Sequence, residues 1–198
     1  LRSAGSSMKK VFSILDEEPV LSNTGTITPD MHNNNVIEFD KVNFSYGRER
    51  VLHDVSFSIN KGEKIAIVGE TGAGKSTIAK LILRFYLPNE GDVNFYGESS
   101  RQVSQKWARK NIAYVPQESF LFRGSIKNNL IYSNPEGINL EQELQEIGVL
   151  DWFERYENGL DQEVGERGAN VSAGERQFIA LLRAVLAKRE IIVFDEAT

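Results

Sequence analysis

Apolar and polar residues alternate along two stretches in the first third of the chain. Residues 36–45 and 51–59 are rich in β-branched and aromatic side chains, and the turn-forming residues 60–63 follow the second stretch. A period of two is typical of β-strands with one buried face. We therefore expect strands over both stretches, and shorter ones over residues 92–96 and 111–115.

Two further runs are almost entirely apolar, residues 64–68 (KIAIV) and residues 190–194 (EIIVF). Such runs predict strands that are buried on both faces, as in parallel sheets. Residues 75–87 and 172–188 instead carry apolar side chains at helical spacing, and residues 120–160 indicate mostly short helices. Strands that alternate with helices favour an α/β core with parallel strands.

The N-terminal part differs in character. Residues 8–15 (MKKVFSIL) place apolar side chains on one helical face, which leaves two interpretations open: a short surface helix, or the end of a helix from an upstream domain. Residues 22–35 are polar and turn-rich, as in a linker. No run reaches the roughly 18 apolar residues of a membrane span. The chain starts without Met and stops at Thr198 after an apolar strand, so we expect a piece of a longer protein.

Composition excludes several classes of site. The chain has 23 Lys and Arg against 28 Asp and Glu, a net charge of −5, so we expect no nucleic-acid partner. It contains no cysteine, which excludes disulfides and cysteine-ligated metals. Its two histidines, His32 and His53, cannot form a histidine-rich metal site.

Residues 69–76 (GETGAGKS) match the pattern G-x-x-x-x-G-K-[ST] between a predicted buried strand and a predicted helix. Glycines let backbone N–H groups converge on phosphate oxygens, and the helix N-terminus adds partial positive charge. Lys75 would reach the β- and γ-phosphates, and the Ser76 hydroxyl would bind Mg²⁺. The nucleotide-binding candidates are Gly69, Glu70, Thr71, Gly72, Ala73, Gly74, Lys75, Ser76 and Thr77.

Two acids follow the apolar run at residues 190–194. Acids at the carboxyl end of a parallel strand lie in the ligand crevice of an open α/β sheet. Asp195 would hold Mg²⁺, and Glu196 would accept a proton from the water that attacks the γ-phosphate.

Residues 170–177 (NVSAGERQ) resemble the signature sequence LSGGQ of ABC-type ATPases, and the order of the three motifs matches that family. The resemblance covers about residues 36–198. The sequence departs from the signature at Val171, Ala173 and Glu175. The resemblance implies a P-loop NTPase core with a mainly parallel sheet, an antiparallel β subdomain and a helical subdomain at about residues 98–170.

The resemblance also implies the site. In the family, the signature of one subunit caps the γ-phosphate of ATP bound to the other, in a head-to-tail dimer; here it comprises Ser172, Ala173, Gly174 and Glu175. Tyr46 resembles the aromatic residue that stacks on adenine. Gln117 resembles the glutamine that touches Mg²⁺ or the attacking water.

Two segments are similar to exporter-type members of the family. One is residues 163–168, in which Glu166 would contact the transmembrane domains, and the other is residues 120–122 (FLF). The resemblance implies transmembrane domains as partners, a place at the cytoplasmic face of a membrane, and residues 1–35 as the connection from an upstream membrane domain. The family places a further loop and a histidine beyond the acidic strand, and both histidines here precede residue 69.

The leading hypothesis is thus the ATP-binding and ATP-hydrolysing domain of an ABC exporter, lacking its C-terminal part, which binds ATP but hydrolyses it poorly. Two alternatives stay open. One is a soluble ABC ATPase without a membrane partner, and the other is a binding-only regulatory half of a heterodimeric exporter.

Overall fold

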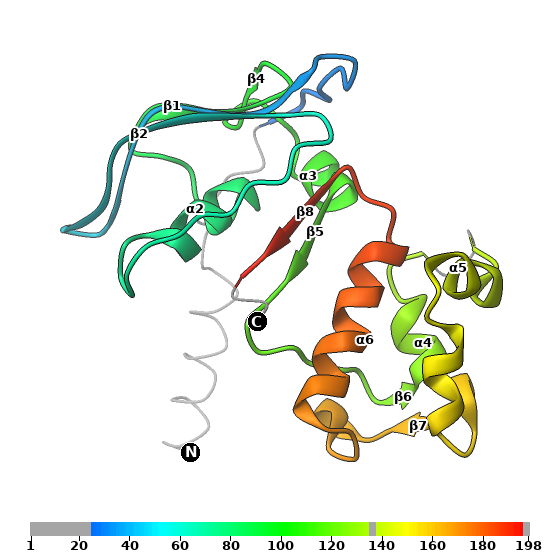
Figure 1. The fold of residues 1–198 in the computed structure, drawn as a ribbon. Helices are drawn as coiled ribbons and strands as arrows, with labels where there is room; N and C mark the ends of the chain where they lie inside the picture. Colours follow the sequence, from blue (N-terminus) through cyan, green and yellow to red (C-terminus); the bar gives the residue numbers. More distant parts are fainter. Residues whose placement is uncertain (1–24, 135–137, 196–198) are drawn as a thin grey trace, which may run out of the picture. The chain divides into compact units, whose positions relative to one another are not determined.

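The computed structural model describes residues 25–134 and 138–195, and the chain divides into two compact units between Gln105 and Lys106 (Figure 1). Unit 1 contains β1 (Asn35–Tyr46), β2 (Glu49–Asn60), α2 (Lys75–Ile82), β3 (Glu90–Phe95) and β4 (Glu98–Ser99). The helix α3 (Gln105–Asn111) begins at the boundary. Unit 2 continues with β5 (Ile112–Val115), β6 (Gly124–Ser125), α4 (Ile126–Leu130), α5 (Leu140–Ile147), β7 (Glu163–Val164), α6 (Ala173–Leu186) and β8 (Ile191–Phe194). It also holds the 3₁₀ helices η1 (Leu150–Arg155), η2 (Gly159–Asp161) and η3 (Glu166–Gly168).

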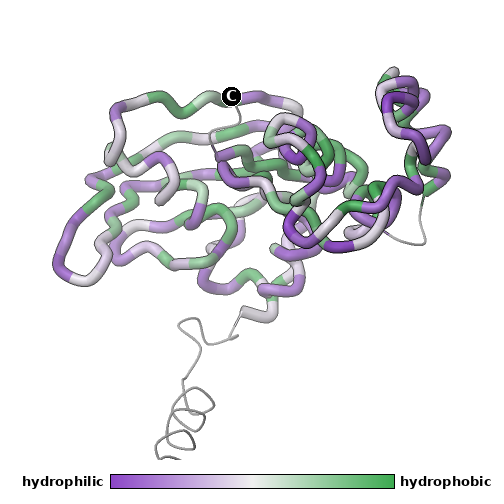
Figure 2. The backbone as a smooth tube through the Cα atoms, turned by 90° about the horizontal axis from the view of Figure 1, so that it is seen from below, coloured by the Kyte–Doolittle hydropathy of each residue, from purple (hydrophilic) through white to green (hydrophobic). Residues whose placement is uncertain are grey.

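Unit 1 is built on an antiparallel sheet with the strand order β2-β1-β3-β4. The alternation in the sequence correctly predicts β1 and β2, which pair Ile37 with Ile59 and Phe39 with Phe57. The rings of Phe39 and Phe57 stack with their centroids 4.5 Å apart. The tip of this hairpin is hydrophilic (Figure 2), so the buried faces gather along the strands and not at the turn.

The helix α2 ends at Ile82, earlier than the predicted Leu87. Arg84 takes a left-handed backbone with φ 54°, and its N–H donates to Leu81 O while Phe85 N–H donates to Lys80 O. This pair of bonds is the Schellman termination, which satisfies carbonyls that the last turn would leave unpaired. The Arg84 guanidinium is buried and donates to the Val103 carbonyl, so tertiary contact, not helix propensity, sets this end.

The prediction of a buried strand at residues 64–68 is wrong for the described structure. These residues belong to no ladder, and Ile65, Ile67 and Val68 are 48%, 40% and 88% exposed. A parallel strand obtains both its hydrogen bonds and its cover from neighbours. All ladders of unit 1 are antiparallel and join other strands, so this apolar run has no neighbour with which to pair there.

Unit 2 contains the parallel ladder of the described residues, in which β5 pairs with β8. The register joins Ile112 to Ile191 and Val115 to Phe194, so both strands end at the same edge. The long helix expected after residue 172 is confirmed as α6, and its buried residues Ile179, Leu182 and Leu186 share a core with α4, α5 and η1. The fold therefore carries the α/β content and the antiparallel sheet that the sequence indicates.

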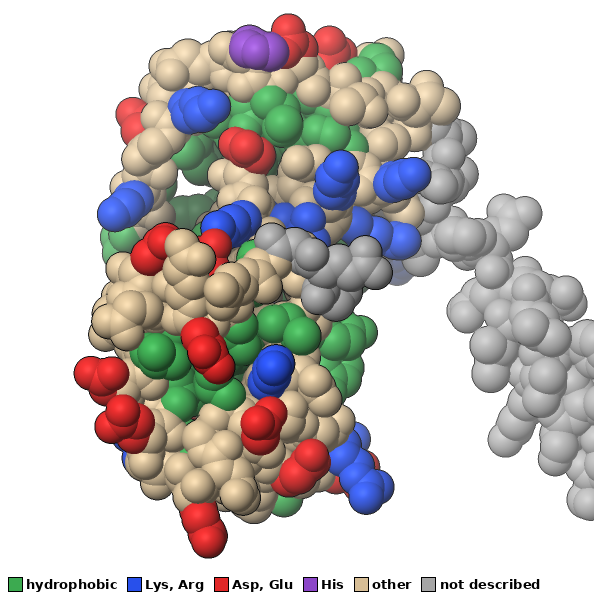
Figure 3. All heavy atoms as spheres, turned by 90° about the vertical axis from the view of Figure 1, so that its right-hand side faces the viewer, with side chains coloured by type: hydrophobic (Ala, Val, Ile, Leu, Met, Phe, Trp, Pro, Cys, Tyr) green, Lys and Arg blue, Asp and Glu red, His purple; other side chains and the backbone are tan. Residues whose placement is uncertain are grey.

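Three remaining expectations concern the charge of the surface, membrane-spanning helices and the helical pattern near the N-terminus. Figure 3 shows frequent acidic side chains on the face of unit 2 that carries α5, whose first turn contains Glu141 and Glu143. Among the described residues, no helix combines the length and apolar character that crossing a membrane requires. The helical pattern at residues 8–15 lies outside the described residues.

One position tests the register of β1 against β3. Gly91 has φ +71°, and a Cβ there would lie 2.3 Å from Lys41 O. Because both the backbone conformation and the close carbonyl oppose a side chain, we expect Gly91→Ala to lower the free energy of unfolding by more than about 2 kcal/mol. Urea denaturation of the purified chain would measure this change.

Gly62 provides the matched control, because it has φ +80° but nothing within 4 Å of an added Cβ. Gly62→Ala should carry only the conformational cost of about 1 kcal/mol. Equal losses for the two variants would show that the contact between Gly91 and β1 is not formed.

Candidate functional site

The loop at residues 69–74 has the backbone shape that its glycines predict. Gly72 and Gly74 have φ of 87° and 89°, in the left-handed region that glycine enters without strain. Ala73 N–H donates to Glu70 O over 3.1 Å, which closes the turn. Residues 69–73 are exposed, so the loop presents its backbone groups to solvent.

The loop leads directly into the N-terminus of α2. Gly74 is its N-cap, no side chain caps it, and its first turn contains no acid. The Lys75 ammonium donates to Gly69 O and Glu70 O, each over 2.8 Å, so it curls back over the loop. The first turn therefore carries the positive charge of Lys75 and the partial positive charge of a helix N-terminus, with no acidic side chain to neutralise them.

The sheet holds this helix start in place. A Cβ on Gly74 would lie 2.6 Å from Leu52 Cδ2 and 3.3 Å from Val51 Cγ1. Only glycine lets the loop approach β2 this closely. The third glycine of the motif therefore has a packing role as well as a conformational one.

Aromatic side chains lie beside the same helix. Thr77 Oγ1 is 3.5 Å from Tyr46 Oη, and the Lys80 ammonium lies 5.5 Å from the centre of the Tyr46 ring. Tyr46 also packs edge-on against Phe44 and Tyr86, with centroids 4.9 and 5.3 Å away. The structure thus brings Tyr46 to Thr77, which follows Lys75 by two residues, as a site that uses all three would require.

In unit 2, the carboxyl ends of β5 and β8 carry the next candidates. Asp195 N–H donates to Val115 O over 3.0 Å, and Tyr114 Oη donates to Asp195 Oδ2 over 3.2 Å. Gln117 follows β5 by two residues. Burial first, and then the charge of Asp195, raise the pKa of Tyr114 above its ordinary value. Glu196 lies outside the described residues.

Sequence reasoning missed Tyr114 as a partner of Asp195. A signal existed, because Tyr114 lies one residue before the end of a strand that was expected to run parallel to the strand before Asp195. What the sequence lacked was the pairing of these two strands, which the register of β5 and β8 supplies.

The signature-like segment begins α6 with a capping box. Ser172 Oγ accepts from Glu175 N–H over 3.2 Å, and Glu175 Oε2 accepts from Ser172 N–H over 2.7 Å. These bonds to Ser172 lower the pKa of the Glu175 carboxyl. Burial first, and the neighbouring Glu175 carboxylate second, raise the pKa of Tyr156 to about 12. Glu175, an acid where the family has an amide, is therefore a structural part of the helix start.

Ala173 and Gly174 occupy the first turn of α6, and both are exposed. An added Cβ on Gly174 would meet nothing within 4 Å. The backbone of these two residues is therefore accessible from solvent, at a helix N-terminus, which favours anions.

The two exporter-like segments lie on the surface of unit 2. Glu166 is exposed in η3, next to Arg167, which has φ 55°. Asn170 fixes this turn, because its side chain donates to Glu163 O and accepts from Gly165 N–H, each over 2.7 Å. Of the FLF segment, Phe120 is 46% exposed whereas Leu121 is fully buried. Phe120 is thus available for a surface contact, and Leu121 belongs to the core.

Comparison with known proteins connects these features. Residues 52–198 match the family described as ABC transporter. The chain is 37% identical over 194 residues to an ATM1-type heavy metal exporter of Novosphingobium aromaticivorans, covering 96% of this chain and 32% of the exporter. It is 37% identical over 207 residues to the mitochondrial iron-sulfur clusters transporter ABCB7 of Homo sapiens, covering 100% of this chain and 27% of that protein.

A solved structure is also similar, a bacterial Atm1-family ABC exporter with ATP bound. The TM-score is 0.88 with 36% sequence identity, over 100% of this chain and 35% of that one. The chain thus spans about a quarter to a third of the length of the curated relatives it matches.

The Glu175 carboxylate gives the capping box a pH dependence. Its pKa is lower in the folded chain than the ordinary 4.5, so its stabilising effect is complete above pH 4.5 and is lost as the pH falls through the folded pKa. We expect Glu175→Gln to be less stable than the wild type by about 0.5 kcal/mol at pH 7. The difference should vanish in strongly acidic solution, as measured by urea denaturation across the pH range.

The exposed Glu157 is the control, because it is outside the capping box. Glu157→Gln should change stability less at pH 7. A Glu175→Gln difference that stays constant as the carboxyl protonates would contradict a capping role for the charge.

Proposed function

The chain belongs to the ABC transporter family, and from this we propose that residues 36–198 form the ATP-binding and ATP-hydrolysing domain of an exporter. The observation that carries the proposal is the loop at residues 69–74, with its left-handed glycines at the start of an uncapped helix. Residues 1–35 would connect it to a membrane domain. Relatives whose names state export favour this role over a soluble ATPase.

The loop fits a nucleoside triphosphate. N–H groups of Gly72 and Gly74 and of the first turn of α2 would bind phosphate oxygens, and the Ala73 N–H would join them by exchanging its bond to Glu70 O. Lys75, now bonded to two neutral carbonyls, would exchange them for the β- and γ-phosphates, a stronger charge-assisted contact. The Tyr46 ring would stack on the adenine.

The proposed magnesium ligands are also chemically suitable. Ser76, Gln117 and Asp195 offer hydroxyl, amide and carboxylate oxygens, which Mg²⁺ prefers. Within the described ranges, no three His, Asp or Glu side chains gather into a metal site. This agrees with an ion held by few protein ligands together with substrate phosphates. When bound, Mg²⁺ would neutralise charge that develops on the phosphates.

Glu196 would accept the proton of the attacking water, and Gln117 would position that water. Lys75 would stabilise negative charge on the γ-phosphoryl group. His32 and His53 are the two histidines of the sequence, and both precede residue 69. Neither lies after the acidic strand, where the family places the histidine that contacts the γ-phosphate, and we propose slow hydrolysis by these 198 residues on their own.

We propose a head-to-tail dimer in which Ser172, Ala173, Gly174 and Glu175 cap the ATP of the partner. The exposed first turn of α6 supports this anion-binding role. Transmembrane domains of the same transporter would contact Glu166 and Phe120, which places the domain at the cytoplasmic face of a membrane.

One observation favours a second candidate, a binding-only regulatory domain. The Glu175 carboxylate accepts from Ser172 N–H and places a negative charge beside the proposed anion site. Repulsion from that charge would weaken capping of the partner's γ-phosphate. Hydrolysis by the full-length transporter, with Glu175→Gln as the test variant, separates the two candidates, because only a weakened cap would be restored by the amide.

Lys75→Ala tests the nucleotide site. Loss of a charge-assisted contact should weaken the binding of Mg·ATP at least tenfold, as measured by isothermal titration calorimetry. Lys61→Ala removes an exposed lysine from a turn outside the loop and should leave the affinity unchanged. Equal affinity in all three proteins would rule out the proposed site.

Glu196→Gln tests the step after binding. The amide cannot accept the proton, so we expect ATP affinity to persist while hydrolysis falls at least a hundredfold in the full-length protein. ATP should then hold the Glu196→Gln variant as a dimer in light-scattering measurements. Adding Ser172→Arg, which places a bulky cation in the proposed interface, should keep the Glu196→Gln variant monomeric. If the double variant still forms the dimer with ATP, the head-to-tail arrangement is excluded.

A further inference from the structure

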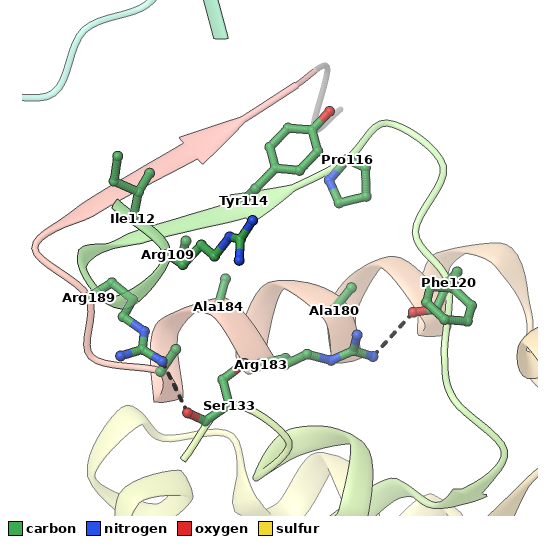
Figure 4. A pocket seen from close by; sticks show the side chains of 12 residues that line it. Arg109, Ile112, Tyr114, Pro116, Phe120, Ser133, Ala180, Arg183, Ala184 and Arg189 are labelled. Atoms are coloured by element: carbon green, nitrogen blue, oxygen red, sulfur yellow. Dashed lines mark hydrogen bonds between the residues drawn. The ribbon is translucent and has the colours of Figure 1, made fainter. Parts of the chain in front are cut away.

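Unit 2 contains a pocket of about 280 Å³ that is lined by α3, β5, α6 and the segments next to them (Figure 4). Three of its lining residues are arginines, Arg109, Arg183 and Arg189, and none is Asp or Glu. None of the residues proposed to hold nucleotide or magnesium lines it. The pocket therefore concentrates positive charge on a chain whose net charge is −5.

Two of these guanidinium groups bond only to neutral oxygens. Arg183 donates to Phe120 O over 3.2 Å and to Asn129 Oδ1 over 3.1 Å. Arg189 donates to Ser133 O over 3.1 Å, and Figure 4 shows this bond and the one to Phe120. Among the described residues, neither arginine has a carboxylate within ion-pair distance.

Arg183 also has an unused donor. Its Nε is buried and has no hydrogen-bond partner. Burial lowers the pKa of this arginine, which shows that its charge is partly removed from water. A desolvated charge is costly unless an opposite charge or further hydrogen bonds compensate for it. The pocket thus offers a partly desolvated positive charge that an anion would neutralise.

The rest of the wall leaves room for such a ligand. Ala180 and Ala184 of α6 and Ala187 at its C-cap line the pocket, where larger side chains would fill it. At about 30 Å³ for each water molecule, the volume equals that of about nine waters. Tyr114 lines the wall as well, but its hydroxyl is bonded to Asp195, so that carboxylate is already engaged.

We propose that this pocket binds an oxyanion of the phosphate class, held by Arg183 and Arg189 with Arg109 facing it across the pocket. Planar guanidinium groups match the geometry of phosphate oxygens and bind them in pairs. The ligand is either free phosphate or a small phosphate monoester, since both present the same oxygens and the pocket has room for each. The proposal does not depend on the proposed nucleotide site.

Calorimetric titration of the 198-residue chain with inorganic phosphate tests this site. The titrations use the Lys75→Ala background, because phosphate could also bind the loop at residues 69–74. We expect saturable binding at constant ionic strength, and about tenfold weaker binding in Arg183→Gln and in Arg189→Gln. Arg123→Gln, which removes an exposed arginine of the same unit outside the pocket, is the matched control and should bind as the background does.

Circular dichroism identifies variants that fail to fold. Arg183→Gln loses the bonds to Phe120 and Asn129. If this variant does not fold, the titrations are made with Arg189→Gln and Arg109→Gln instead. Glycerol phosphate distinguishes the two ligand sources: tighter binding than phosphate supports a monoester, and equal binding supports free phosphate. The proposal is overturned by an equal loss of binding in Arg123→Gln, or by the same signal with potassium chloride alone.

Discussion

The left-handed backbone at Gly74 is the constraint on which the candidate site depends. It sets the residue at which α2 begins, and it does so where Leu52 and Val51 of β2 leave no space for a side chain. The sheet therefore fixes the helix, and the helix fixes the direction of its first N–H groups. No side chain caps that end, and a helix N-terminus of this kind favours an anion.

The N-terminus of α6 is also part of the candidate site, but unlike that of α2 it is capped by side chains. There Ser172 and Glu175 satisfy each other's backbone groups in a capping box, and the following two residues remain exposed. Glu175 departs from the family's Gln at the third helical position, where either residue can form a capping box. Under the proposal that this turn caps the partner's ATP, the same negative charge would weaken the contact with the γ-phosphate.

The sequence predicts well where local pattern and final contacts agree. The strands β1 and β2 follow from alternation, α6 from helical spacing, and the loop at residues 69–76 from a motif that constrains its own backbone. Prediction from the sequence fails where contacts with distant parts of the chain determine the structure. Residues 64–68 have the composition of a buried strand but no neighbouring strand in unit 1, and the end of α2 depends on the burial of Arg84. Tyr114 and the arginine pocket were missed for the same reason, because their contacts join segments that are far apart in the chain.

Amide hydrogen exchange is the most direct test of the claim that the loop backbone and the start of α2 bind the phosphates. The rates at residues 70–77 would be compared with and without Mg·ATP, with residues 60–63 as an internal reference. Our account predicts strong protection at residues 70–77 and unchanged exchange at the reference turn. Binding of ATP without any slowing of exchange at residues 70–77 would contradict it.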